Sequence, residues 1–246
     1  MIIHIIITGG KMVKNIINIQ FQKEEHLKNH CIKRFNGFTL AEVLITLVII
    51  GVIAAMTIPT LINKTNNHEY VSRLKKAYST MAQATNKIIS DYGNPNASIG
   101  GWATSTEEIF NMYKKYLGNV KECGVGTAGC FQGTYKNLLN GSTGDLDTNR
   151  YTLIMADGSE LSMTQGSNNF SADCSRSVVG SDNACQVILV DVNGAKKPNK
   201  VGHDVFTFTL KENGLYPTGC DYDYCEGTTG WGCACKVLHE GAINYL

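Results

Sequence analysis

The chain has 246 residues, of which 43% are hydrophobic, so it can form one medium-sized core and is not disordered by composition. The net charge of +1 is unevenly distributed: residues 1–37 carry six Lys and Arg against two Glu, and the rest carries 16 Lys and Arg against 19 Asp and Glu. Neither part has the basic patch typical of nucleic-acid binding, so we do not expect a nucleic-acid partner.

A long apolar stretch over residues 38–62 follows two cations, Lys33 and Arg34. Glu42 is the one charged residue between Phe38 and Asn63, and about 20 apolar residues rising 1.5 Å each span a hydrocarbon core of about 30 Å. A cleaved secretory signal has a shorter apolar region, so we expect a retained transmembrane helix. The cations place residues 1–37 in the cytoplasm and the C-terminal bulk outside.

The same helix is expected to continue over residues 63–92 as an amphipathic segment. Gly51 and Pro59 are tolerated in membrane helices and mark expected points of bending. Beyond Pro59, apolar residues recur in steps of three and four and form one helical face, with Thr85 as its polar position. These residues are Tyr70, Val71, Leu74, Ala77, Tyr78, Met81, Ile88 and Tyr92. The sequence Gly93-Asn94-Pro95 is expected to end the helix.

The stretch GFTLAEVLITLVIIGVIAAMTIP, from Gly37 to Pro59, resembles the N-terminal signature of type IV prepilins and type II secretion pseudopilins. The Gly-Phe junction, the glutamate five residues into the mature chain, the apolar length and the proline all match. The resemblance implies that a prepilin peptidase cuts after Gly37, removes residues 1–37 as a leader and methylates the amine of Phe38. The long leader departs from the pattern because its start, MIIHIIITGG, is apolar, and Met12 is an alternative start of translation.

Glu42 is costly inside a membrane, by roughly 2.5–3.5 kcal/mol at a helix centre, so it requires a partner. The resemblance implies that Glu42 pairs with the new amine of Phe38 in a neighbouring subunit, and that Glu42 and Pro59 belong to the assembly helix. The alternative interpretation is a glutamate that extends to the cytoplasmic interface without an assembly role.

Residues 93–246 are expected to form an extracytoplasmic globular head. Ser105 and Glu108 have the spacing of a capping box and predict a short helix. Alternating patterns then predict two strands within residues 151–164 joined across Asp157-Gly158, a buried strand within 185–194, and a hairpin within 205–217 around Asn213-Gly214. The predicted fold is α+β: a long N-terminal helix, half membrane-spanning and half amphipathic, packed on a small antiparallel sheet. Trp102 and Trp231 are expected to pack inside the head.

Nine cysteines divide into Cys31 in the leader and eight in the head. Eight cysteines in a glycine-rich region predict up to four disulfides formed in an oxidising compartment, with local pairing the simplest of 105 connectivities. The alternatives are a zinc site of the last four cysteines with His239, or reduced cysteines in a cytosolic protein. The eight candidate residues are Cys123, Cys130, Cys174, Cys185, Cys220, Cys225, Cys233 and Cys235.

The segment VDVNGAKKPNKVGHDVFTFTL, within residues 190–210, is similar to a segment of the heads of bacterial pilin-like proteins. Asp191, Asn193 and Asp204 are oxygen ligands that flank a turn-rich loop, so they are candidate ligands of a structural calcium ion. The alternative is a loop whose polar side chains bond only to the local backbone. No other cofactor is expected.

The sequence contains none of the catalytic or nucleotide-binding motifs G-x-S-x-G, H-E-x-x-H and G-x-x-x-x-G-K-[ST]. The expected function is therefore that of a structural subunit of a type IV pilus or secretion pseudopilus, anchored in the inner membrane before assembly. Its expected partners are prepilin peptidase, other pilin subunits and an assembly platform. One alternative is a minor or tip pilin whose head binds a surface, or DNA through Lys196, Lys197 and Lys200. A membrane-anchored exported enzyme is the least favoured.

Overall fold

The computed structural model describes residues 37–125, 130, 134–136, 143–145, 150–165, 169–178, 180–222, 225 and 229–245. The predictions for residues 1–36 of the leader, including Cys31 and the alternative start at Met12, lie outside the described residues. The chain divides into two compact units, of which one ends at Val52 and the other begins at Ile53.

Helix α2 extends over Leu40–Tyr92 as one helix of 53 residues and passes through Gly51 and Pro59 without interruption. It ends where the sequence predicts, since Gly93 has a positive φ of 82° and donates a 2.8 Å hydrogen bond to the carbonyl of Ile89. Glycine adopts this left-handed conformation at no steric cost and so closes the helix.

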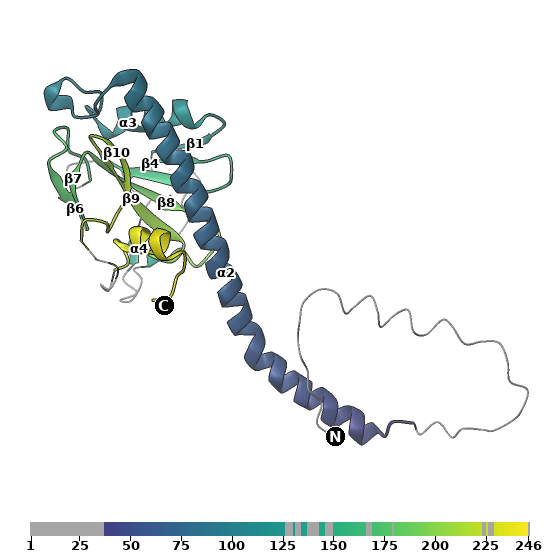
Figure 1. Cartoon of the computed structure of the whole chain (residues 1–246). Helices are drawn as coiled ribbons and strands as arrows, with labels where there is room; N and C mark the ends of the chain where they lie inside the picture. The colour runs from purple at the N-terminus through teal and green to yellow at the C-terminus, as the bar shows by residue number, and fades with distance from the viewer. Residues whose placement is uncertain are drawn as a thin grey trace, which may run out of the picture. The chain divides into compact units, whose positions relative to one another are not determined.

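The second half of α2 buries the face that the apolar periodicity predicts. Tyr70 is the first buried side chain of this face, and Ile88 is the last. Two predicted members differ: Tyr78 is only partly buried, and Tyr92 is 45% exposed because it lies in the last turn. This half of α2 lies across the strands of the head (Figure 1). The buried members are Tyr70, Val71, Leu74, Ala77, Met81, Thr85 and Ile88.

A six-stranded antiparallel sheet forms the centre of the head, in the order β1-β4-β5-β8-β9-β10. The predicted strands are confirmed, but the last hairpin turns at Glu212-Asn213, because Gly214 already pairs with Lys211. Two further pairs, β2–β3 and β6–β7, are separate from this sheet. The bounds are β1 Lys121–Val125, β2 Thr134–Lys136, β3 Thr143–Asp145, β4 Arg150–Ile154, β5 Glu160–Thr164, β6 Arg176–Val178, β7 Ser181–Ala184, β8 Gln186–Asp191, β9 Val205–Lys211 and β10 Gly214–Pro217.

The central strand β8 is buried on both faces of the sheet. Ile188 and Val190 join the hydrophobic cluster that contains the buried face of α2. Val187 and Leu189 point to the opposite face, where they join a second cluster. This alternation follows from the period of two in a strand. The sheet therefore has one face covered by α2 and a second face available for other segments of the head.

Three shorter helices complete the head: η1 Ala97–Ile99, α3 Thr106–Leu117 and α4 Cys233–Glu240. Ser105 caps α3 as predicted, since its side chain accepts a 3.2 Å hydrogen bond from the N–H of Glu108. The Glu108 carboxylate reaches back to the N–H of Thr104, at 3.3 Å, one residue earlier than an ideal capping box. Helix α4 and strands β1, β2, β3, β6 and β7 were not predicted.

Candidate functional site

The predicted processing site lies immediately before α2. Gly37 and Phe38 precede the helix, and the Phe38 side chain is 86% exposed. A Cβ atom added at Gly37 would meet no atom within 4 Å, so the described chain itself imposes no steric need for glycine there. Among the described residues the glycine therefore has no packing role, which is consistent with a role in recognition by a second protein.

Glu42 closes the first turn of α2. Its N–H donates a 3.2 Å hydrogen bond to the hydroxyl of Thr39, and its Oε2 atom accepts from the Thr39 N–H at 2.9 Å and the Thr39 hydroxyl at 3.0 Å. This reciprocal arrangement is a capping box. Sequence reasoning missed it, although the pattern Thr-x-x-Glu before an apolar run is its usual signal.

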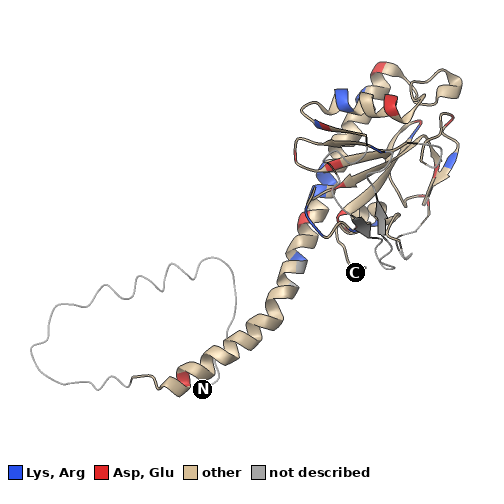
Figure 2. Cartoon of the chain, turned by 180° about the vertical axis from the view of Figure 1, so that it is seen from behind, with Lys and Arg blue, Asp and Glu red and all other residues tan. Residues whose placement is uncertain are grey.

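The N-terminal half of α2 exposes a continuous apolar surface. The helix carries no charged residue between Glu42 and Lys64, so this part of its ribbon is tan in Figure 2. The helix is long and apolar enough to cross a membrane. Exposed apolar surface of this extent requires a lipid or protein cover. The exposed residues are Val43, Leu44, Ile45, Leu47, Val48, Ile49, Ile50, Val52, Ile53, Met56, Ile58, Leu61 and Ile62.

All eight candidate cysteines of the head are paired in disulfides, each with a partner from its own sequence neighbourhood. The last four form a nested arrangement around the start of α4, which sequence reasoning had left open. Cysteines in disulfides have no thiolate to offer zinc, so this pairing favours the disulfide prediction over the zinc alternative for the last four. The pairs are Cys123–Cys130, Cys174–Cys185, Cys220–Cys235 and Cys225–Cys233.

The candidate calcium ligands lie at the end of β8, where Asp191 is the last residue, and in the loop that joins β8 to β9. Asp204 accepts hydrogen bonds from the N–H groups of Asn199 at 2.8 Å and Lys200 at 2.6 Å, and from the Asn193 amide at 3.1 Å. Asp191 accepts from the N–H of Asn193 at 3.1 Å. Burial raises the pKa of Asp204, and these donors oppose that rise. Backbone donors therefore occupy the carboxylates, which supports the alternative of a loop held by its own hydrogen bonds.

No group of three or more His, Cys, Asp and Glu side chains within the described ranges is arranged to hold a metal ion. Asp204 is fully buried and bonded to the two residues that follow the turn at Lys197-Pro198. Its carboxylate thus organises the turn, whether or not an ion is present.

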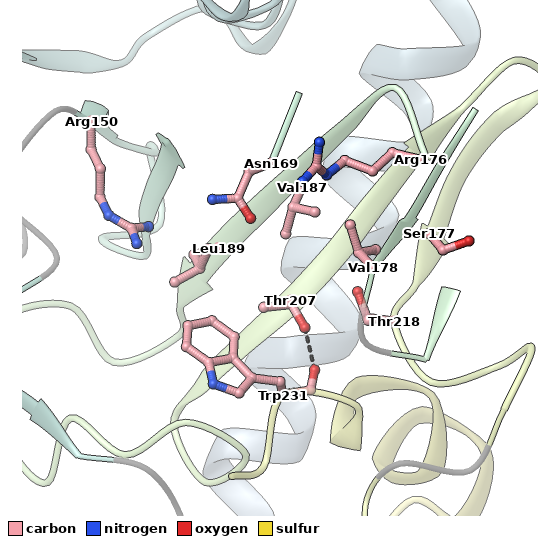
Figure 3. A pocket seen from close by; sticks show the side chains of 10 residues that line it. All are labelled: Arg150, Asn169, Arg176, Ser177, Val178, Val187, Leu189, Thr207, Thr218 and Trp231. Carbon is pink, nitrogen blue, oxygen red and sulfur yellow. Dashed lines mark hydrogen bonds between the residues drawn. The ribbon is translucent and has the colours of Figure 1, made fainter. Parts of the chain in front are cut away.

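A pocket of about 460 Å³ opens on the second face of the sheet. Val187 and Leu189 of β8 form its apolar floor, and the Trp231 indole lies at one end (Figure 3). Arg150 and Arg176 also line it, with the Asn169 side chain between their guanidinium groups in this view (Figure 3). Sequence reasoning missed this pocket, and it assigned Trp231 only to the packed interior of the head.

Comparisons with known proteins identify two segments. The prokaryotic N-terminal methylation motif, the hallmark of type IV prepilin and pseudopilin-type proteins, matches residues 32–58. This motif implies processing by prepilin peptidase and assembly with other pilin-type subunits. No curated protein and no solved structure matches the chain significantly. A family of unknown function, DUF6613, matches residues 60–223, about two thirds of the chain. The chain is thus a type IV pilin-like or pseudopilin-type protein that belongs to the DUF6613 family.

Proposed function

We propose that the mature chain is a structural, non-catalytic subunit of a type IV pilus or a type II secretion pseudopilus and polymerises through α2. The observation that carries this proposal is the exposed apolar surface between Val43 and Ile62, directly after a methylation motif. Exposure of apolar surface to water costs about 25 cal/mol per Å². A membrane would cover this surface before assembly, and the equivalent helices of neighbouring subunits would cover it afterwards.

The proposed location is the cytoplasmic membrane, with the head outside. Lys33 and Arg34 precede the apolar run, which favours a cytoplasmic N-terminus. The four disulfides support an oxidising environment for the head. The two observations concern opposite ends of the chain and favour the same orientation.

Glu42 has the geometry for a contact with a second subunit. Both bonds from Thr39 reach the same carboxylate oxygen, Oε2, and no described residue donates to Oε1. The remaining oxygen therefore suits the Phe38 amine of a neighbour after cleavage. Two opposite charges in a low dielectric offset each other's desolvation cost, so pairing would favour an assembled position of the helix.

The test is a Glu42→Val variant expressed in the native host. We expect normal amounts of processed monomer in the membrane and loss of sheared filaments or of secretion through the pseudopilus. Thr57→Val is the matched control, since it also lengthens the apolar surface of α2 but leaves Glu42 in place. Wild-type assembly by Glu42→Val would contradict the proposal, and so would equal loss of assembly in the control.

A further inference from the structure

Strand β9 runs alongside the second half of α2, in the same direction as the helix. Just before β9 begins, the Nε2 atom of His203 lies 3.0 Å from the Oδ1 atom of Asn67. Just after β9 ends, the Glu212 carboxylate accepts a 3.4 Å hydrogen bond from the side chain of Asn94, which follows α2. The loop over residues 192–204, which joins β8 to β9, therefore lies at the end of the head nearer the apolar half of α2. We call this end the base of the head.

The base of the head lies close to the end of the apolar run. Ile62 is the last residue of the exposed apolar surface, and Asn67, which contacts the base, follows it after five residues. At 1.5 Å per residue this is about 7.5 Å along the helix. The headgroups add about 5–8 Å to each side of a hydrocarbon core of about 30 Å. A membrane that covers α2 as far as Ile62 would therefore place the base of the head at its headgroups.

Three lysines lie in the loop at the base of the head: Lys196, Lys197 and Lys200, which we call the base lysines. The first two are exposed and the third is partly exposed. None of the three forms an ion pair with a described residue. The carboxylates at the two ends of the loop, Asp191 and Asp204, are fully buried. The loop therefore presents positive charge to its surroundings, although after residue 37 the chain carries 16 Lys and Arg against 19 Asp and Glu.

Exposed carboxylates near the base do not cancel this charge. Glu69 of α2 is paired with Arg73, with 2.8 Å between Oε1 and Nε. Glu240 at the end of α4 is exposed, but Lys64 adds an exposed cation between the apolar run and the base. These two charges offset each other, so the base lysines leave the base with a net positive charge.

The loop holds the base lysines on a fixed backbone. The Asp204 carboxylate accepts hydrogen bonds from the N–H groups of Asn199 and Lys200, and the Lys200 carbonyl accepts from the N–H of Asp204 at 3.2 Å. The His203 ring meets the Tyr70 ring edge-on and joins the loop to α2. A preformed group of cations binds an anionic surface with a smaller entropic cost than a mobile one.

We propose that the base lysines bind the anionic headgroups of the membrane in which α2 is anchored. The proposal rests on the proposed function, in which α2 crosses the membrane and the head lies outside. Cations beside an anionic membrane are attracted to its phosphates, and the attraction falls off within a Debye length, about 8 Å at physiological salt. The contact would hold the head on the membrane before assembly and would break when the subunit enters a filament.

The test is lysine footprinting of the full chain in bilayer nanodiscs, with a neutral acylating reagent and mass spectrometry as the readout. One sample contains phosphatidylcholine alone, and the other contains equal parts of phosphatidylcholine and phosphatidylglycerol. We expect the base lysines to react about fivefold more slowly in the anionic bilayer, and we expect high salt to remove this protection. Lys87 and Lys115, which contact Tyr116 and Tyr92 near the opposite end of the head, should react equally in both samples.

A double variant tests whether the lysines act together. Lys196→Gln combined with Lys197→Gln should reduce the protection of Lys200 from about fivefold to about twofold or less, because less charge attracts the loop to the bilayer. Lys87→Gln combined with Lys115→Gln is the matched control. It also removes two exposed cations, but at the opposite end of the head, and should leave the protection of Lys200 unchanged. Full protection of Lys200 in the first variant would contradict the proposal.

Lys64 separates a failure of this proposal from a failure of the proposed function. It lies two residues beyond Ile62, so it should be protected whenever α2 is inserted that far. Protection of Lys64 without protection of the base lysines would overturn this proposal alone, and protection of neither would overturn the proposed anchoring as well. Equal protection of the base lysines by a DNA duplex, added to phosphatidylcholine nanodiscs at physiological salt, would identify a nucleic-acid site and would also overturn the proposal.

Discussion

The backbone N–H of Thr39 donates a 2.9 Å hydrogen bond to the carboxylate of Glu42, and the N–H of Glu42 donates in return to the Thr39 hydroxyl at 3.2 Å. The charged residue in the apolar run thus has a structural role in its own helix. It satisfies one of the N–H groups that every helix leaves without a partner at its start. The assembly role proposed for Glu42 adds to this local role, because it would use the other carboxylate oxygen.

Loss of the Thr39 side chain should loosen the first turn of α2 without abolishing the helix. Thr39→Ala removes an N-cap, which typically costs about 1 kcal/mol, so the Glu42 amide should exchange its hydrogen about fivefold faster. Hydrogen exchange of the chain in detergent micelles measures this. Thr46→Ala is the control, since the Thr46 hydroxyl donates to the Val43 carbonyl and does not take part in the Thr39–Glu42 box. An unchanged exchange rate of the Glu42 amide in Thr39→Ala would show that the Thr39–Glu42 capping box does not stabilise the first turn of α2.

Thr85 and Tyr113 join α2 to α3 through a buried hydroxyl pair 2.5 Å apart. Thr85→Val should destabilise the head by about 1–3 kcal/mol, because it leaves the buried Tyr113 hydroxyl without a partner. Tyr113→Phe should cost less, about 0.5–1.5 kcal/mol, because the Thr85 hydroxyl still bonds to the Met81 carbonyl at 2.8 Å. Denaturant unfolding of both single variants and the double variant measures this. An equal or larger cost for Tyr113→Phe would contradict the interpretation.

His203 should make the stability of the head depend on pH. Its Nε2 atom lies 3.0 Å from Oδ1 of Asn67, and its ring meets the Tyr70 ring edge-on with 5.2 Å between centroids. Burial, with a smaller contribution from Lys200, lowers the pKa of His203 from 6.5 to about 4. The unfolded chain therefore binds more protons between these pH values, and stability is lost as pH falls through this window.

We expect the free energy of unfolding of the head to fall by about 1–2 kcal/mol between pH 7 and pH 4.5 because of His203. This is less than the whole pKa shift would give, since the ring is partly exposed. Unfolding by urea at both pH values measures the loss. His203→Gln should show a smaller loss, and His239→Gln, which changes an exposed histidine, should behave as wild type. The pKa of Asp173 is lowered to about 2, so this carboxylate changes its charge at lower pH and does not contribute to the loss measured here. Equal losses in His203→Gln and wild type would refute this assignment.

The disulfide Cys220–Cys235 should contribute more to stability than Cys123–Cys130. The two bonds close segments with sequence separations of 15 and 7, for which loop entropy predicts about 3 and about 2.4 kcal/mol. The longer bond also holds α4 beside the sheet, where the Cys235 N–H donates to the Thr218 carbonyl at 3.2 Å. Double Cys→Ser variants of each pair, compared by denaturant unfolding, measure both values. The reverse order would contradict this account.

The strongest predictions from sequence were those based on a regular period. The buried face of α2 and strands β4, β5, β8 and β9 follow apolar repeats that the local chain can satisfy on its own. Helix α4 has no such signal: Gly232 provides no side-chain cap, and Cys233 and Cys235 hold it through disulfides to Cys225 and Cys220 in the preceding loop. Its position depends on tertiary pairing rather than on local propensity.

The candidate sites also differ in whether a local sequence pattern reveals them. Gly37, Phe38 and Glu42 lie in one short stretch of the sequence, so the motif alone indicates their role. The pocket residues Arg150 and Trp231 come from segments about 80 residues apart. Arg150 belongs to β4, and Trp231 accepts a hydrogen bond from Thr207 of β9, so both reach the pocket because β4 and β9 belong to one sheet. No local pattern could have brought them together. The Thr39–Glu42 box did have a local signal, the pattern Thr-x-x-Glu at the start of an apolar run.

The most direct test of the central claim is the intact mass of the chain extracted from membranes or sheared filaments. We predict a mature chain that begins at Phe38 and carries one methyl group, and we predict that Gly37→Ala, which fits the described chain without a clash, accumulates as unprocessed precursor. An intact leader in the wild-type protein, or a mature chain that begins beyond Ala54, would contradict the pilin-type account.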